Sequence, residues 1–237
     1  MPRTRTKRKL LPLSGGERLF THRLWGSAKG VRSNNCYAYA FGDFESFRGM
    51  KSSPGNRSSN NRLRQGSLKC RDLMKRVLAD NPKKVYRVRA ETRCRPKYYK
   101  TMLVTAPGRD FHWYRQHGVI EWKIKKGETA ASIARFLRIS PARVRAAVAK
   151  NNGRDKRTGK LKVGKNIRIN ANGWSHKRGW ATAPLLKDAR GKVIKDPRTA
   201  SRAYPGLNYS KFCGAFCVRS KGIRTGRNWR GVKNRWI

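Results

Sequence analysis

Hydrophobic and polar positions change their period several times between residues 120 and 170. Apolar residues alternate with polar ones at 120–124, which predicts a short strand with one buried face. Thr129 and Ser140 are good N-caps for two successive helices whose apolar residues recur at helical spacing. Apolar residues at 161–169 close the stretch as a second strand. The pattern therefore predicts a small, self-contained strand–helix–helix–strand (βααβ) unit.

The flanking sequence predicts further elements of both kinds. A pair of asparagines supplies an N-cap for a helix that begins at Cys36, and residues 67–78 carry apolar residues on one side of a second helix. Residues 98–105 are typical of a strand, and a turn at 107–110 leads into the next strand. With 37% hydrophobic residues, the chain has enough apolar material for a modest core, and we expect an α+β fold.

The βααβ stretch resembles a LysM domain through its glycine–threonine entry and its order of elements. The resemblance implies binding of N-acetylglucosamine polymers such as chitin or peptidoglycan. It places the sugar between two loops, with Gly127, Glu128, Thr129, Asn151 and Asn152 as candidate glycan-binding residues. Lysines and arginines crowd these loops, although an uncharged glycan does not need them. The alternative is that the unit is a compact module used against a protein partner.

The segments on either side of this unit would form a continuous structure if it were removed. Residues 111–116 and 173–177 are both aromatic-rich and strand-like, which predicts neighbouring strands of one hairpin. The tip of a hairpin tolerates an inserted domain well. The sequence therefore predicts a host domain at 31–118 plus 173–218, interrupted by the inserted module at 119–172.

The host domain places a cysteine on a helix, a histidine on a later strand and a polar residue one strand further on. This order is papain-like, and with the segments NCYAYA and DFHWYRQ it resembles cell-wall amidopeptidases of the NlpC and CHAP type. The resemblance implies Cys36 as nucleophile, His112 as general base, and His176 or Asp110 as the group that orients the base. The alternative is that Cys36 is a buried small hydrophobe and His112 a hydrogen-bonded core residue. The fold would then be a scaffold without catalytic activity.

Charge limits the function classes that suit this chain. It has 59 lysines and arginines against 12 acidic residues, a formal net charge of +47. Because a compact domain with that charge repels itself, we expect an anionic partner. The ends are the most basic parts, which predicts extended basic arms at 1–30 and 219–237. The candidate polyanion-binding residues are Arg3, Arg5, Lys7, Arg8, Lys9, Arg224, Arg227, Arg230, Lys233 and Arg235.

Cysteine usage predicts reduced thiols in the cytosol or nucleus. The count of five is odd, and neither a secretory signal nor an apolar run of membrane-spanning length is visible. The spacing of Cys213 and Cys217 predicts two sulfurs on one face of a strand. A zinc site would also need Cys70 and Cys94, and no CxxC pair supports it, so we expect neither a metal nor a cofactor.

The combination of a split host domain, a LysM-like insertion and basic ends resembles basic virion proteins of large DNA viruses of eukaryotes. This resemblance implies a minor capsid or core-associated protein, located in the virion and assembled in the host cytoplasm or nucleus. It would bridge acidic capsid or core proteins, or DNA or RNA. Two alternatives remain open: a LysM-anchored cysteine amidase or peptidase that acts on cell wall, and a sequence-independent nucleic-acid-binding protein.

Overall fold

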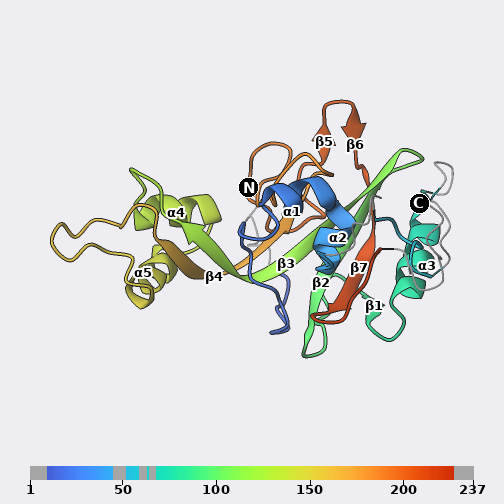
Figure 1. Cartoon of the computed structure of the whole chain (residues 1–237), viewed down its shortest axis with the longest axis horizontal. Coiled ribbons are helices and arrows are strands. Elements are labelled where there is room, and N and C mark those ends of the chain that lie inside the picture. The colour runs from blue at the N-terminus through green and yellow to red at the C-terminus, as the bar shows by residue number, and fades with distance from the viewer. Residues whose placement is uncertain (1–9, 45–51, 59–62, 64–67, 227–237) are drawn as a thin grey trace, which may run out of the picture.

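The computed structural model describes residues 10–44, 52–58, 63 and 68–226 of the chain. Within these residues the fold is α+β, built around an antiparallel five-stranded sheet of order β1-β7-β2-β3-β4, with a small β5–β6 hairpin beside it (Figure 1). None of the helices in these residues has the length and apolar character required to cross a bilayer. The elements are α1 Ala28–Ser33, α2 Cys36–Phe41, α3 Cys70–Asp80, β1 Val85–Val88, β2 Tyr98–Ala106, β3 Asp110–Lys123, α4 Ala130–Leu137, α5 Pro141–Lys150, β4 Asn166–His176, β5 Ala203–Tyr204, β6 Leu207–Asn208 and β7 Lys211–Arg219.

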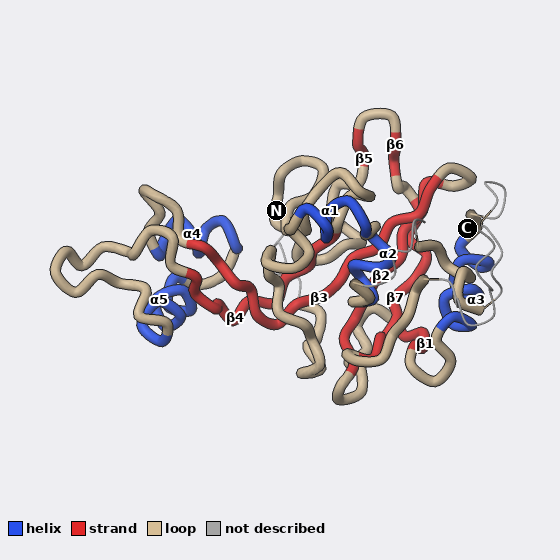
Figure 2. Tube along the Cα trace, in the orientation of Figure 1, coloured by secondary structure: helices blue, strands red, loops and turns tan. Residues whose placement is uncertain are grey.

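Two long strands, β3 and β4, run through both parts of the molecule. They pair in antiparallel register from Tyr114 opposite His176 to Lys123 opposite Asn166, with one register shift between His117 and Val119. The Tyr114 and His176 ends of the pair lie in the part of the sheet that also contains β2. The Lys123 and Asn166 ends lie beside α4 and α5, at the opposite end of the molecule from α3 (Figures 1 and 2). The predicted hairpin pairing of 111–116 with 173–177 is confirmed.

The helix starts of the βααβ unit follow local capping chemistry. The Thr129 hydroxyl accepts from the Ser132 backbone N–H and the Ser132 hydroxyl accepts from the Thr129 backbone N–H, which is a reciprocal capping box. Ser140 precedes Pro141 at the first position of α5. The second strand begins at Asn166, later than expected, because residues 153–165 form turns with only an isolated bridge at Leu161.

The βααβ unit shares its core with the rest of the chain, so the prediction that it is self-contained is wrong. Phe20 and Leu186 are buried among its apolar residues. Phe20 also bonds to β3 through the backbone: its N–H donates to Val119 O at 3.0 Å, and its carbonyl accepts from Glu121 N at 2.9 Å. The βααβ unit is therefore anchored to two distant segments of the chain.

The predicted arms at 1–30 and 219–237 include described residues that belong to the fold. Leu11, Phe20 and Trp25 are buried, and residues 28–33 form α1, so the chain from residue 10 onward belongs to the fold. At the other end Ile223 and Thr225 are buried. Composition misled the prediction because a few apolar residues can anchor a segment whose surface is basic. The candidate residues Arg3, Arg5, Lys7, Arg8, Lys9, Arg227, Arg230, Lys233 and Arg235 lie outside the described residues.

The expectation of reduced thiols is wrong for four of the five cysteines. Disulfides join Cys70 to Cys213 and Cys94 to Cys217, and Cys36 is in neither. Cys213 and Cys217 also do not share a face. A bulge in β7 inserts Cys213 between the residues paired with Leu103 and Val104, and one extra residue reverses the alternation of side chains. Because of this bulge, each cysteine meets a different partner.

Candidate functional site

Cys36 is the first residue of α2 and is buried. The Asn35 side chain caps this helix and accepts from the backbone N–H groups of Tyr37 and Ala38, both at 3.1 Å, as the asparagine pair predicted. The Cys36 thiol donates to Phe111 O at 3.8 Å. That oxygen belongs to the peptide group joining Phe111 to His112. The sulfur therefore lies against the backbone that carries the predicted base.

His112 and His176 are brought together across the β3–β4 pairing, although 64 residues separate them. Tyr114 is opposite His176, so alternation puts His112, Tyr114 and His176 on one face of the sheet. His112 Nε2 and His176 Nδ1 are 2.8 Å apart, and both rings are buried. His176 Nε2 is 2.9 Å from Lys187 O. The two rings and the carbonyl thus form a continuous hydrogen-bonded row.

The hydrogen-bond partners assign the protons in this row. Burial lowers the pKa of His176 to about 4, so its ring is neutral near pH 7 and carries one N–H. A carbonyl can only accept, so His176 Nε2–H donates to Lys187 O and His176 Nδ1 must accept from His112 Nε2–H. With Nε2–H donating to His176, Nδ1 is the other ring nitrogen of His112 and is not part of this row.

Asp110, the other candidate for orienting the base, is engaged elsewhere. One carboxylate oxygen accepts from its neighbour Phe111 N at 2.8 Å, and the other accepts from Tyr209 Oη–H at 2.7 Å. Burial and the Asp110 charge both raise the pKa of Tyr209, which keeps this phenol protonated as the donor. The Tyr209 ring lies 5.0 Å from that of His112. Of the two candidates, the structure therefore pairs His112 with His176.

A cavity of about 230 Å³ opens beside His112. Its walls include Tyr204 and Tyr209 on either side of the β5–β6 turn, and Arg178, whose guanidinium stacks 4.5 Å from the Tyr204 ring centroid. Sequence reasoning did not single out these three residues. The available signal was the Pro-Gly turn between two tyrosines, which is typical of a short hairpin.

Lys177 is a further residue that the sequence analysis did not single out. Its side chain is buried, and its ammonium donates to Val31 O at 2.8 Å, Asn34 O at 2.6 Å and Gly179 O at 2.6 Å. Burial lowers the pKa of Lys177 to about 8, and the nearby Cys36 charge acts in the opposite direction. The bonds to Val31 O and Asn34 O tie the end of α1 and the segment just before α2 to the chain that follows His176.

A buried polar network links α2 to strands β3 and β4. Tyr39 Oη lies 2.5 Å from Ser175 Oγ, and that hydroxyl lies 2.6 Å from His117 Nε2. The Arg115 guanidinium donates to Tyr39 O at 2.8 Å and stacks on the Tyr39 ring. Burial holds the pKa of His117 well below its ordinary value, so this imidazole stays neutral. These contacts set the position of the Cys36 helix relative to β3 and β4.

The glycan-binding candidates of the βααβ unit largely serve its own loops. Glu128 accepts from Trp122 Nε1–H at 2.9 Å, Thr129 caps α4, and the Asn151 amide donates to Ala147 O at 2.7 Å. Gly127 and Asn152 have positive φ angles of 78° and 50°. The two loops are thus preformed, and no contact between them singles out a sugar site.

Among the residues that the structure describes, no three histidine, cysteine or acidic side chains group to hold a metal ion. The conceivable zinc ligands Cys70 and Cys94 are in disulfides. Comparison with known proteins finds no matching family model, curated protein or solved structure.

Proposed function

We propose that this protein is a cysteine-dependent amide hydrolase with a papain-like centre of the NlpC and CHAP type. The observation that carries the proposal is the row His112–His176–Lys187 O, in which His112 Nε2–H donates to His176 and Nδ1 is the other ring nitrogen of His112. The Cys36 thiol lies against the peptide group that precedes this base. A nucleophile, a base and a group orienting that base are the parts that thiol acyl transfer needs.

In the proposed reaction His112 Nδ1 takes the proton of Cys36 Sγ, and the thiolate attacks the carbonyl carbon of an amide. The resulting tetrahedral adduct collapses to a thioester as His112 returns the proton to the leaving amine. Water then attacks the thioester with His112 again as base, which releases the acid and restores the thiol. Throughout, His176 holds the His112 ring by accepting from its Nε2–H.

The proposed substrate is a cell-wall glycopeptide, with the LysM-like unit at 119–172 as its anchor. Support comes from the direct continuation of β3 and β4 from the proposed centre into that unit. A net charge of +47 also favours a polymer whose peptides carry free carboxylates. Amide cleavage in such a polymer joins the three features in one activity.

The test measures the alkylation rate of Cys36 by iodoacetamide against pH, together with release of amines from peptidoglycan. His112→Ala should remove the low-pH alkylation and the hydrolysis, whereas Asp110→Asn should retain most of both because Asp110 bonds to Tyr209. A thiol that reacts equally in the native protein and in His112→Ala, with no amine released by either, would refute the proposed hydrolase.

A second candidate function is favoured by the charge alone. With 59 basic and 12 acidic residues, we propose that the protein serves as a minor capsid or core-associated component of a large DNA virus, bridging acidic proteins or nucleic acid. A salt titration of binding to duplex DNA tests the nucleic-acid branch, since phosphate contacts weaken steeply with salt. Proteomics of purified particles tests the virion location. The two functions are compatible, because a particle can carry a hydrolase.

A further inference from the structure

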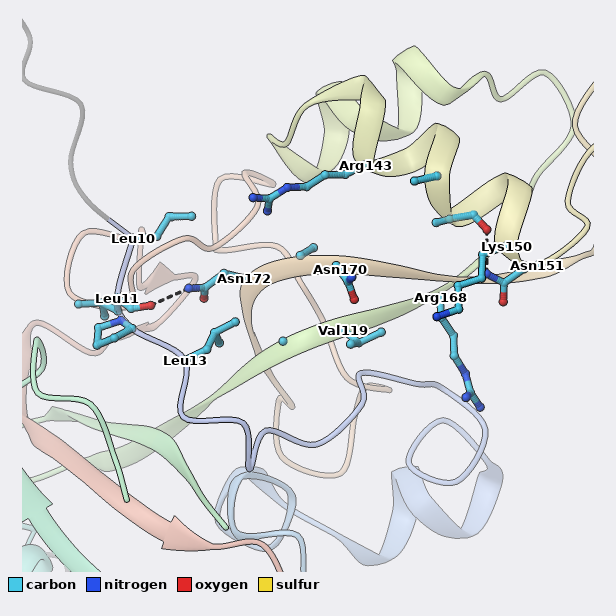
Figure 3. Close-up of a pocket in the computed structure, with 15 residues that line it drawn as sticks. Leu10, Leu11, Leu13, Val119, Arg143, Lys150, Asn151, Arg168, Asn170 and Asn172 are labelled. Carbon is cyan, nitrogen blue, oxygen red and sulfur yellow. Dashed lines mark hydrogen bonds between the residues drawn. The ribbon is translucent and has the colours of Figure 1, made fainter. Parts of the chain in front are cut away.

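A groove of about 860 Å³ lies apart from the Cys36 centre, between α5, β4 and the N-terminal segment (Figure 3). The chain at residues 10–13 forms one side, and the outward face of α5 forms another. Arg168 and Asn170 of β4 line it and are exposed. The groove lies between the βααβ unit and the N-terminal segment, and of the five residues named by the LysM resemblance only Asn151 lines it.

The groove is lined by cations without a matching carboxylate. Its charged residues are Arg143, Lys150 and Arg168, and none of the three forms an ion pair within the described part of the chain. Lys195 lies just behind, donating to Asn172 O at 3.3 Å. Burial, and then the positive charges of Arg138 and Arg143, lower the pKa of Lys195 to about 8. An anion bound here would therefore relieve repulsion that the fold leaves uncompensated.

The polar residues that line the groove are spread along its length on α5 and β4. Arg143 and Lys150 lie two helical turns apart on one face of α5, a rise of roughly 10 Å. Arg168, Asn170 and Asn172 alternate onto one face of β4 over roughly 13 Å. Figure 3 shows Arg143 reaching toward Leu10, with Lys150 and Arg168 at the other end. Cations at both ends with amides between them suit a linear polymer that carries repeated charges.

The chemistry of the lining favours a sugar chain over nucleic acid. Among the described residues no aromatic side chain lines the groove, so these residues offer unpaired bases nothing to stack on. Guanidinium and ammonium groups bind carboxylates through charge-assisted hydrogen bonds, and amides can bind sugar hydroxyls. We propose that this groove binds a carboxylated polysaccharide. The proposal adds a class of polymer to the proposed function. Binding of the polymer in the groove does not depend on the hydrolase, and only its cleavage rests on the proposed function.

The test measures binding of short oligogalacturonate to the Cys36→Ala protein by calorimetry at fixed low salt. The groove variant Arg143→Gln/Lys150→Gln should bind at least about tenfold more weakly, since each lost charge-assisted contact contributes more than a kcal/mol. The matched control Arg145→Gln/Lys162→Gln makes the same change in charge at exposed positions that do not line the groove, and should bind within about twofold of the parent.

Three outcomes would overturn the proposal. Equal weakening by both double variants would mean that net charge alone attracts the glycan. Equal affinity for neutral chitin oligomers would remove the role of charge. Tighter binding of oligothymidylate, weakened by the groove variant, would make this a nucleic-acid groove. Because binding is measured without the thiol, failure here leaves the hydrolase intact, and failure of the hydrolase leaves this binding intact.

Discussion

The protonation state of His176 leads to a quantitative prediction about acid stability. Folding lowers the pKa of this imidazole from 6.5 to about 4, so the unfolded chain binds its proton more tightly. Stability from this group is therefore complete above about pH 6.5 and is lost as the pH falls toward 4. The gap between the two values corresponds to about 3.4 kcal/mol in full, of which about 1.8 kcal/mol is lost between pH 7 and pH 5.

The perturbation is His176→Gln, which offers one acceptor for His112 Nε2–H and one donor for Lys187 O but does not titrate. Urea unfolding at pH 7 and pH 5, at constant ionic strength, gives the free energy of unfolding for each protein. His117 contributes in the same direction, so the informative quantity is the difference between wild type and variant. The variant should lose about 1.8 kcal/mol less than the wild type.

The control is Arg145→Gln, at an exposed side chain without an imidazole, which should follow the wild-type pH dependence within about 0.5 kcal/mol. Equal losses in wild type and His176→Gln would refute the reasoning. They would mean that His176 titrates normally in the folded protein, and the proton assignment in the row would lose its support.

Three further predictions concern what holds the fold together. Phe20→Ala should lower the free energy of unfolding by about 3 kcal/mol in urea titrations, because it opens a cavity in the shared core, and a loss below about 1 kcal/mol would contradict that burial. Lys177→Met should cost about 3 kcal/mol in the same assay, because three carbonyl oxygens lose their donor; unchanged stability would argue against those bonds. Cys217→Ser removes a crosslink to Cys94 that spans 123 residues and should cost about 2–5 kcal/mol; an identical unfolding midpoint with and without reductant in the wild type would contradict the disulfide.

Much of the candidate site was predictable because its local signals are strong. Asn35 ahead of Cys36 marks a helix start, and the aromatic segments around His112 and His176 mark two strands that form one hairpin. The choice between His176 and Asp110 was not predictable. It depends on the phenol of Tyr209, which arrives from a hairpin almost a hundred residues further along and occupies the Asp110 carboxylate.

The sequence by itself determined the features that depend on a few neighbouring residues. Capping at Thr129, the start of a helix at Pro141, and alternation in the paired strands β3 and β4 follow from local chemistry and period. The excess of basic residues near both ends gave no sign that these segments also contain buried apolar residues. Composition is an average over all positions, whereas burial depends on each position separately.

Only the tertiary structure decided which distant residues meet. One extra residue at Cys213 turns two same-strand cysteines toward different partners. Lys177 can be buried because the carbonyls of Val31 and Asn34, more than 140 residues earlier in the chain, accept from its ammonium. The basic groove exists because Arg143 on α5 faces the N-terminal segment across β4. Such contacts depend on register and packing between segments far apart in the chain, and a local pattern carries no information about either.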